Sequence, residues 1–406
     1  ATDGTNAVTA ASAFTLAFGY NWSNTTQQQK IVASDAAAGD NFGKGLDIDG
    51  DTIIVGAYYE DAGGTDAGAA YVFTRSGTTW SQQAKLTASD AQAEDYFGVS
   101  SDIDGDTVVV GAYGEDAGGT YAGAAYIFTR SGTTWSQQAK LTASDASTAD
   151  YFGISSAISG DTVVVAAHQE STGGTGAGAV YVFTRSGTTW SQQQKLVASD
   201  PQTGDNLGYW VCIDGDTVVV GAPHEDAGGS NAGAAYVFTR SGTTWTQQQK
   251  IVASDAQASD YFGRSTAISG DTVVVGAYAD DHNYTDAGAA YVYTRSGTTW
   301  SQQAKLTASD AQASDQFGFR TAISGDTVVV SAHQEDAGGS NAGAAYIFTR
   351  DGTTWTQDKK IVASDAGASD KFGYNVGMDE GTVVVGAQYE DAEGTDAGAA
   401  YVFIAG

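Results

Sequence analysis

The chain has 406 residues, of which 53 are Gly and only 2 are Pro, and its 48 acidic residues outnumber 18 basic ones to give a formal net charge of −30. A surface this acidic repels nucleic acid and anionic lipid, and it attracts cations or basic partners. The hydrophobic content of 41% excludes a disordered chain. No apolar run reaches the length of about 18 residues that membrane insertion needs, and a single cysteine excludes an internal disulfide framework.

The sequence repeats with a period of 55 residues. A Phe-Gly dipeptide, a Tyr-Val-Phe-Thr-Arg segment or close variant, and a Gly-Thr-Thr-Trp turn recur in constant phase. The dipeptide begins at Phe42, Phe97, Phe152, Phe262, Phe317 and Phe372, and Leu207-Gly208 takes its place in the remaining copy. Seven copies cover nearly the whole chain, so we expect seven copies of one structural unit.

Each unit predicts four short strands. In the first unit, one strand follows Phe42-Gly43 and ends at the hairpin signal Asp49-Gly50-Asp51. The other three strands are expected at residues 52–57, 69–75 and 80–88. No window shows the 3.6-residue apolar period of a helix. Seven such units predict an all-β protein, a seven-bladed β-propeller with four antiparallel strands in each blade.

The two ends of the chain complement each other. The last unit stops at Phe403 after its third strand, whereas residues 25–32 match the fourth strands of the other units. We therefore expect the N-terminal strand to complete the C-terminal blade, which removes two sheet edges and gives a propeller domain over residues 25–406. Residues 1–24 remain as an N-terminal segment. Because its stretch Ala13–Phe18 looks like another third strand, the segment is either a tail packed on the rim or a donor strand for a neighbouring molecule.

The repeated residues resemble a known family. Phe-Gly, then Gly-Asp-Thr-Val-Val-Val-Gly-Ala, then Gly-Ala-Ala-Tyr-Val-Phe resembles the FG-GAP repeat, the blade of integrin α-subunit propellers and of many bacterial secreted proteins. The fourth unit carries the full Gly221-Ala222-Pro223. The resemblance implies a propeller that is secreted or displayed on a cell surface, but such propellers serve adhesion, sugar binding and assembly alike. The family's long calcium hairpin is absent, since Asp49-Gly50-Asp51 leads directly into the second strand.

Topology predicts which loops share a face of the ring. In an up-and-down blade, the loop between the fourth and first strands and the loop between the second and third strands lie together. We call this side the loop face; it comprises residues 32–41 and 58–68 of the first unit and their equivalents. More than half of the 48 acidic residues belong to it.

The loop face also carries the positions that differ most between the units. A recognition surface must vary in this way to fit an asymmetric partner, although neutral drift of exposed loops predicts the same pattern. The candidate ligand-binding residues are Tyr58, Tyr59, Tyr113, His168, His224, Tyr278, His333 and Tyr389.

Acidic side chains of the loop face are candidates for calcium, which takes six to eight oxygen ligands. In the first two units the candidate ligands are Asp35, Asp40, Glu60, Asp61, Asp90, Asp95, Glu115 and Asp116. The alternative is that these carboxylates begin turns and cap backbone amides. No other cofactor is indicated.

No nucleophile elbow, P-loop or dinucleotide fingerprint is present, and a carboxylate repeated in seven units is poor evidence for a unique general acid, so we expect no enzymatic activity. The chain begins at Ala1 without a signal-like segment, so we expect any export signal to have been removed. The sequence therefore predicts a secreted or surface-displayed recognition or adhesion module that binds a protein or glycan on a cell or matrix surface. Two alternatives remain open: a structural subunit of a surface layer or filament that self-associates through the N-terminal segment, and a multivalent lectin.

Overall fold

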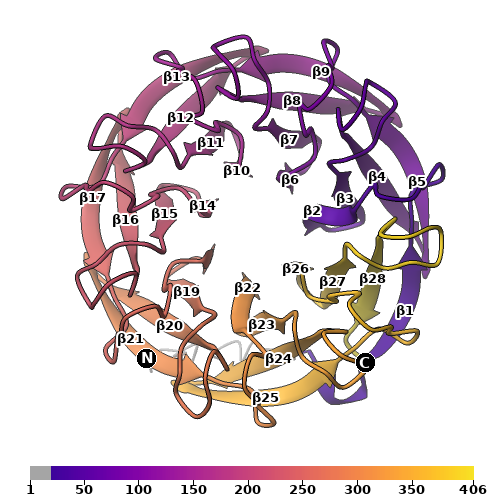
Figure 1. The fold of residues 1–406 in the computed structure, drawn as a ribbon, viewed down its shortest axis with the longest axis vertical. Helices are drawn as coiled ribbons and strands as arrows, with labels where there is room; N and C mark the ends of the chain where they lie inside the picture. Colours follow the sequence, from indigo (N-terminus) through magenta and orange to yellow (C-terminus); the bar gives the residue numbers. More distant parts are fainter. Residues whose placement is uncertain (1–19) are drawn as a thin grey trace, which may run out of the picture.

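The computed structural model describes residues 20–406, which form a ring of seven sheets, each with four antiparallel strands (Figure 1). The expected seven-bladed β-propeller is confirmed. Within these residues the only helix is the three-residue 3₁₀ turn η1 (Trp22–Asn24), and no helix among them is long and apolar enough to cross a membrane. The stretch Ala13–Phe18, expected as a tail or donor strand, lies outside the described residues.

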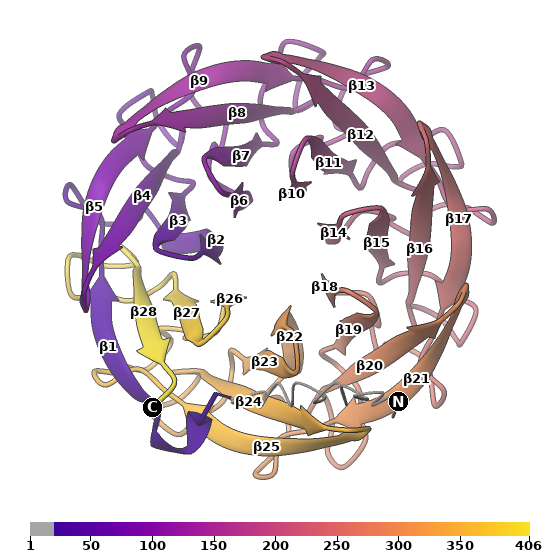
Figure 2. The same ribbon diagram turned by 180° about the vertical axis from the view of Figure 1, so that it is seen from behind.

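The two inner strands of each blade lie nearest the central axis (Figures 1 and 2). From blade 1 to blade 7, the innermost strands are β2 (Phe42–Asp49), β6 (Ser101–Asp104), β10 (Ser155–Ser159), β14 (Val211–Asp214), β18 (Ser265–Ser269), β22 (Phe317–Ser324) and β26 (Asn375–Asp379). The second strands are β3 (Thr52–Ala57), β7 (Thr107–Ala112), β11 (Thr162–Ala167), β15 (Thr217–Ala222), β19 (Thr272–Ala277), β23 (Thr327–Ala332) and β27 (Thr382–Ala387). Every residue of the second strands is buried, as their runs of β-branched side chains predict.

The two outer strands of each blade form the rim. The third strands are β4 (Ala69–Ser76), β8 (Ala124–Ser131), β12 (Ala179–Ser186), β16 (Ala234–Ser241), β20 (Ala289–Ser296), β24 (Ala344–Asp351) and β28 (Ala399–Ile404). The outermost strands are β5 (Thr79–Leu86), β9 (Thr134–Leu141), β13 (Thr189–Leu196), β17 (Thr244–Ile251), β21 (Thr299–Leu306), β25 (Thr354–Ile361) and, for blade 7, β1 (Thr26–Ile31).

The hydrophobic core lies between neighbouring blades, and the Phe-Gly dipeptide is built into it. Phe97 packs with Ile54 and Val72 of blade 1 and lies edge-on to Tyr126 of blade 2 at 5.6 Å between ring centres. The glycine that follows has a φ of +96°, and a Cβ on Gly56 would lie 1.9 Å from its carbonyl oxygen. At this contact a side chain on either glycine would push the two backbones apart.

The propeller closes as the sequence predicts. Strand β1 pairs antiparallel with β28, with Thr26 opposite Ile404 and Ile31 opposite Ala400. The last sheet therefore has the order β1-β28-β27-β26, and Figure 2 shows indigo β1 beside yellow β28. Next to this junction, Trp22 of η1 is buried against side chains of blades 6 and 7, and the Gly406 N–H donates to the Asn21 carbonyl at 3.0 Å.

A circle of seven hydrogen bonds joins the blades on the side opposite the loop face. We call this side the hairpin face; it comprises the turns at residues 49–52 and 76–79 and their equivalents. The last residue of each innermost strand accepts a bond of 2.6 to 3.2 Å from a backbone N–H of the next blade. The pairs are Asp49 with Gly105, Asp104 with Gly160, Ser159 with Gly215, Asp214 with Gly270, Ser269 with Gly325, Ser324 with Glu380 and Asp379 with Gly50. A hydroxyl accepts as well as a carboxylate, which explains why Ser and Asp alternate here.

Candidate functional site

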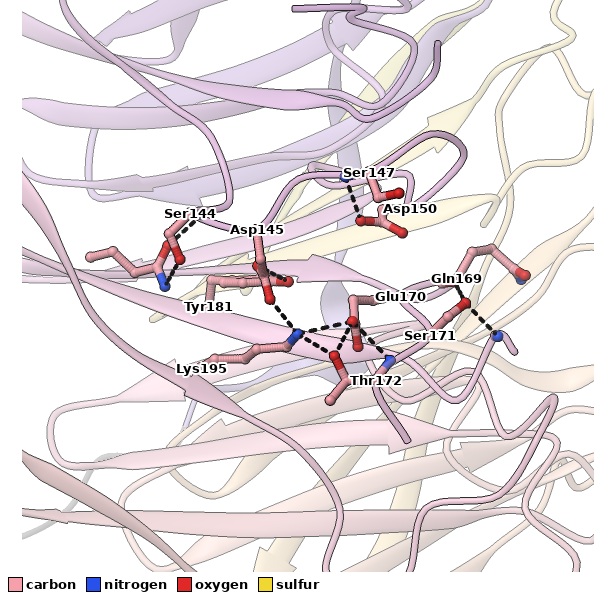
Figure 3. A network of polar contacts seen from close by, with 12 residues as sticks. Ser144, Asp145, Ser147, Asp150, Gln169, Glu170, Ser171, Thr172, Tyr181 and Lys195 are labelled. Carbon is pink, nitrogen blue, oxygen red and sulfur yellow. Dashed lines mark hydrogen bonds and ion pairs between the residues drawn. The ribbon is translucent and has the colours of Figure 1, made fainter. Parts of the chain in front are cut away.

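A lysine of the outermost strand organises the acidic loops of every blade. In blade 3, Lys195 Nζ lies 2.7 Å from Asp145 Oδ2 and 2.9 Å from Glu170 Oε1, and the Tyr181 hydroxyl donates to Asp145 at 2.8 Å (Figure 3). The lysine thereby ties the two loops of the loop face to the blade rim. The same bridge is made by Lys30, Lys85, Lys140, Lys195, Lys250, Lys305 and Lys360.

The candidate calcium ligands of blade 1 have partners of this kind. Asp35 and Glu60 lie 2.6 and 2.8 Å from the ammonium of Lys85. Asp40 accepts the Ala37 N–H at 2.8 Å, and Asp61 accepts the Asp66 N–H at 2.9 Å.

In blade 2 the equivalents Asp90, Asp95, Glu115 and Asp116 repeat these contacts with Lys140 and with backbone N–H groups. Among residues 20–406, no group of three or more His, Cys, Asp or Glu side chains is arranged to hold a metal ion. A calcium ion bound by Asp35 and Glu60 would compete with the ammonium group of Lys85. Calcium binding stays a prediction.

One buried carboxyl in each blade has an altered acidity. Asp95 is 2% exposed, and burial, together with the charge of Glu115, raises its pKa to about 6 although the Gln92 N–H opposes the shift. Asp260 and Asp315 also have pKa values of about 6, and the pKa of the equivalent residue is raised in every other blade. In contrast, the pKa of Asp35 is lowered despite burial, because the Lys85 ammonium donates a hydrogen bond to it and places a positive charge beside it. The loop face thus has two classes of carboxyl group with opposite shifts.

The eight candidate ligand-binding residues lie in one continuous belt of aromatic contacts. Neighbouring ring centres are 3.7 to 6.4 Å apart. In order around the propeller, this aromatic belt consists of Tyr59, Tyr58, Tyr96, Tyr113, Tyr151, His168, Tyr209, His224, Tyr261, Tyr278, Phe319, His333, Tyr374 and Tyr389. Lys44 closes the gap, since its Nζ lies 5.6 Å from the ring centre of Tyr58 and 4.6 Å from that of Tyr374.

The belt is recessed into the propeller. All of its members are buried or half-buried, and His333, 3% exposed, stacks on Phe319 with ring centres 3.7 Å apart. Burial lowers the pKa of His168 to about 4, and burial together with nearby cations such as Lys371 lowers the pKa of His333 well below its usual value. Both imidazoles are therefore neutral at pH 7, and their buried Nδ1 atoms have no hydrogen-bond partner in the described part of the chain. The belt offers aromatic faces and neutral polar nitrogens.

Three belt tyrosines occupy strained backbone positions. The residue before Phe-Gly has a positive φ in each blade, with values of 56°, 56° and 55° at Tyr96, Tyr151 and Tyr261. Asn41 and Asn206, which suit this left-handed conformation better, hold the same position in blades 1 and 4. A bulky side chain kept where a smaller one fits better is typical of a functional surface.

The cations beside the belt were not among the residues predicted from the sequence. Seven lysines and six arginines recur in phase, and each pairs with acidic residues of its own network. The basic residues without a repeated equivalent are Lys44, Arg264, Arg320, Lys359 and Lys371. Lys44, Arg264 and Arg320 line one cavity at the loop-face end of the central channel. Their departure from the repeat was a signal present in the sequence, at the two positions that follow Phe-Gly.

Comparison with known families supports the repeat seen in the sequence and in the fold. The model of the FG-GAP repeat family matches residues 25–73, 80–128, 135–183, 190–238, 245–293, 300–348 and 355–403. A search of curated proteins finds no match.

Proposed function

The chain belongs to the FG-GAP repeat family, and from this premise we propose that it is a non-enzymatic, extracellular recognition or adhesion propeller. Its loop face binds a protein or glycan on a cell or matrix surface. The observation that carries the proposal is the aromatic belt, a continuous recessed surface made from residues that differ between otherwise similar repeats.

The contrast between constant and variable positions supports recognition. The lysine bridges use the same residue types in nearly every blade, and the circle of hairpin bonds recurs in every blade with Asp or Ser as the acceptor, as a packing role allows. The belt positions hold Tyr, His or Phe in an order without sevenfold symmetry. Such a surface fits one ligand per propeller better than seven equivalent ligands. Aromatic residues on a rigid scaffold also lose little conformational entropy when they bind a partner.

The chemistry of the loops supports a non-enzymatic role. The carboxylates of Asp35 and Glu60, and their equivalents, are engaged by lysine or by backbone N–H groups. The same arrangement in seven blades offers no unique acid and base pair. FG-GAP repeat proteins are typically extracellular and non-catalytic, which agrees with the acidic composition of this chain.

A binding screen with two tyrosine variants tests the proposal. The full chain is applied to a glycan array and to immobilised matrix proteins, together with Tyr113→Ala and Tyr284→Ala. Tyr113 belongs to the belt, whereas Tyr284 is an exposed loop tyrosine, 54% accessible, that makes no aromatic contact in the described residues. We expect binding that Tyr113→Ala weakens at least about tenfold and Tyr284→Ala leaves unchanged. Binding that is equally insensitive to both variants would contradict the proposal.

A further inference from the structure

The loop-face end of the central channel contains a cavity of about 140 Å³. Because one water molecule takes up about 30 Å³, the cavity accepts a group considerably larger than a single water. The lining residues that matter here are Lys44, Tyr209, Trp210, Arg264, Arg320 and Tyr374. They come from blades 1, 4, 5, 6 and 7, whose innermost strands converge on the axis (Figure 1).

The two arginines of this cavity are held between aromatic rings. Arg264 is 9% exposed, and its Cζ lies 4.6 Å from the ring centre of Tyr209 and 4.3 Å from that of Phe319. Arg320 is 4% exposed, and its Cζ lies 3.9 Å from the ring centre of Trp210. Arg320 Nη1 donates to the Phe319 carbonyl at 3.0 Å. The contacts with aromatic faces restrain each guanidinium and leave its other N–H groups able to donate.

These guanidinium groups have unused donors. Arg264 Nη1 and Arg320 Nε are buried without a hydrogen-bond partner among the described residues. Within residues 20–406, no carboxylate oxygen lies within 4.0 Å of the charged nitrogens of Lys44, Arg264 or Arg320. The only side-chain hydrogen bond of Lys44 in that range is a long one, 3.3 Å, to the Tyr374 hydroxyl. Three cations therefore line one cavity in a protein of net charge −30, and within residues 20–406 none of them has an acidic partner.

The positive charge of these side chains lowers the pKa of two neighbouring tyrosines. Lys44 lowers the pKa of Tyr374 to about 8, and Arg264 lowers the pKa of Tyr209, in both cases against the effect of burial. Burial without a partner is costly for a charged group, so an arrangement of this kind needs a compensating anion.

We propose that this cavity binds the carboxylate of an acidic sugar, a hexuronic acid at the end of a glycan. The inference rests on the proposed function and names the ligand class of the same face. The carboxylate accepts hydrogen bonds from Arg264 and Arg320, and the sugar ring packs on belt aromatics such as Tyr209 and Tyr374.

Two features favour a single carboxylate on a ring over a polyanion. The planar fork of arginine matches the two oxygens of a carboxylate, and aromatic faces suit the apolar side of a sugar ring. The surrounding loop face carries most of the acidic residues, which repel a ligand with many negative charges. A ligand that enters this channel should therefore carry its negative charge on a single group.

Calorimetric titration of the full chain at constant ionic strength tests the proposal, with D-glucuronate, D-glucose and sodium sulfate as probes. Glucose has the same ring without the charge, and sulfate is an oxyanion without the ring. We expect one glucuronate per chain, bound at least about tenfold more tightly than either other probe, and a loss of about tenfold or more in Arg264→Gln and in Lys44→Gln. Arg295→Gln, which alters a repeated arginine of the hairpin face, is the matched control and keeps wild-type affinity.

Three results would overturn the inference. The first is no glucuronate binding by a wild-type chain that melts cooperatively, and the second is binding that survives both Arg264→Gln and Lys44→Gln. The third is equal affinity for sulfate and glucuronate, which would reduce the site to a general oxyanion site. If glucuronate fails but Tyr113-dependent binding to glycans or matrix persists, the proposed function survives and the uronic acid assignment alone is wrong. If glucuronate binds while no glycan or matrix component does, the proposed function fails instead.

Discussion

Charged side chains in the outer blades and at the channel mouth are arranged in opposite ways. In the outer blades, each repeated lysine lies between two carboxylates, and each repeated arginine, such as Arg130, pairs with a hairpin Asp. At the channel mouth, Lys44, Arg264 and Arg320 lie within one cavity without an acidic partner in the described residues. The lysine bridges recur in all seven blades and the arginine pairs in six, whereas the channel-mouth arrangement occurs once in the described residues.

The difference separates scaffold from candidate site. A contact that only stabilises the blade works equally well in all seven copies. An unpaired buried charge destabilises the fold, so it persists where it serves another purpose. The break in the repeat therefore indicates where a ligand binds, more directly than the abundance of any residue type does.

The largest expected effect is a pH dependence of the free energy of unfolding, caused by the buried aspartates that recur in every blade. Asp95, Asp260 and Asp315 have folded pKa values of about 6, above the ordinary 3.8, so the folded chain binds protons between pH 4 and 6 that the unfolded chain has released. The free energy of unfolding should therefore fall by a few kcal/mol as the pH rises from about 4.5 to 7. Asp35 and its equivalents have lowered pKa values, so they stabilise the fold while they are ionised. They become protonated when the pH falls below the ordinary pKa of aspartate, so stability declines again.

Urea denaturation at pH 3, 4.5 and 7 measures this profile. His168, with its lowered pKa, acts in the opposite direction over the same range, but seven aspartates outnumber the two buried histidines. Asp95→Asn removes one of these aspartates. The difference between its free energy of unfolding and that of wild type should be smaller at pH 4.5 than at pH 7. A profile that rises steadily from pH 4.5 to 7 would show that these carboxyl groups are ionised in the fold.

Removal of one repeated lysine should come next in size. Lys140→Met leaves Glu115, whose side chain is 3% exposed, without its counter-ion. Loss of one partner from a buried pair costs about 3 kcal/mol, so the urea midpoint should fall clearly. Lys359→Met, on the same outermost face but without a carboxylate partner in residues 20–406, is the control and should change little.

Replacement of a cationic residue by Met at the channel mouth should stabilise the fold, whereas the same replacement in the outer blades destabilises it. Arg320→Met removes a buried guanidinium with an unpaired Nε and keeps an apolar chain against Trp210. We expect the free energy of unfolding to rise by about 1 kcal/mol. A clear loss of stability would mean that stacking on Trp210 outweighs the missing partner, and the contrast between the two regions would lose its meaning.

Tyr151→Asn should change binding and leave stability almost unaltered. The asparagine of blades 1 and 4 suits the left-handed backbone at this position, which offsets the lost contacts with Tyr113 and His168. Thermal melting should shift by no more than about 2 °C, while affinity for the loop-face ligand falls. A large drop in melting temperature together with unchanged binding would make the belt a packing feature.

The smallest expected effect concerns calcium. If the loop carboxylates bind calcium, the ion competes with lysine, so calcium should raise the melting temperature of Lys85→Gln more than that of wild type. Differential scanning fluorimetry with calcium and with a chelator gives the comparison. If calcium and chelator leave the melting curve of each protein unchanged, calcium does not bind at the loop face.

The sequence by itself determined the fold, because its signals are local and repeated. Strand order and blade number follow from Gly at hairpins such as Gly50 and from β-branched runs such as residues 52–57. Closure follows from residues 25–32, which match the fourth strands of the other units. They also assign each loop to a face, which is why all eight candidate ligand residues lie in one belt.

Only the tertiary structure decided which side chains meet across blades. Lys44 approaches Tyr374 across 330 residues of chain. The 55-residue repeat shows which positions are equivalent in the blades, but it does not show which side chains touch. The sequence shows that Lys44, Arg264 and Arg320 break the repeat, but not that ring closure brings them to one axis. These three residues lie close together because seven packed sheets curve into a ring, which is a property of the assembled ring and not of any single unit.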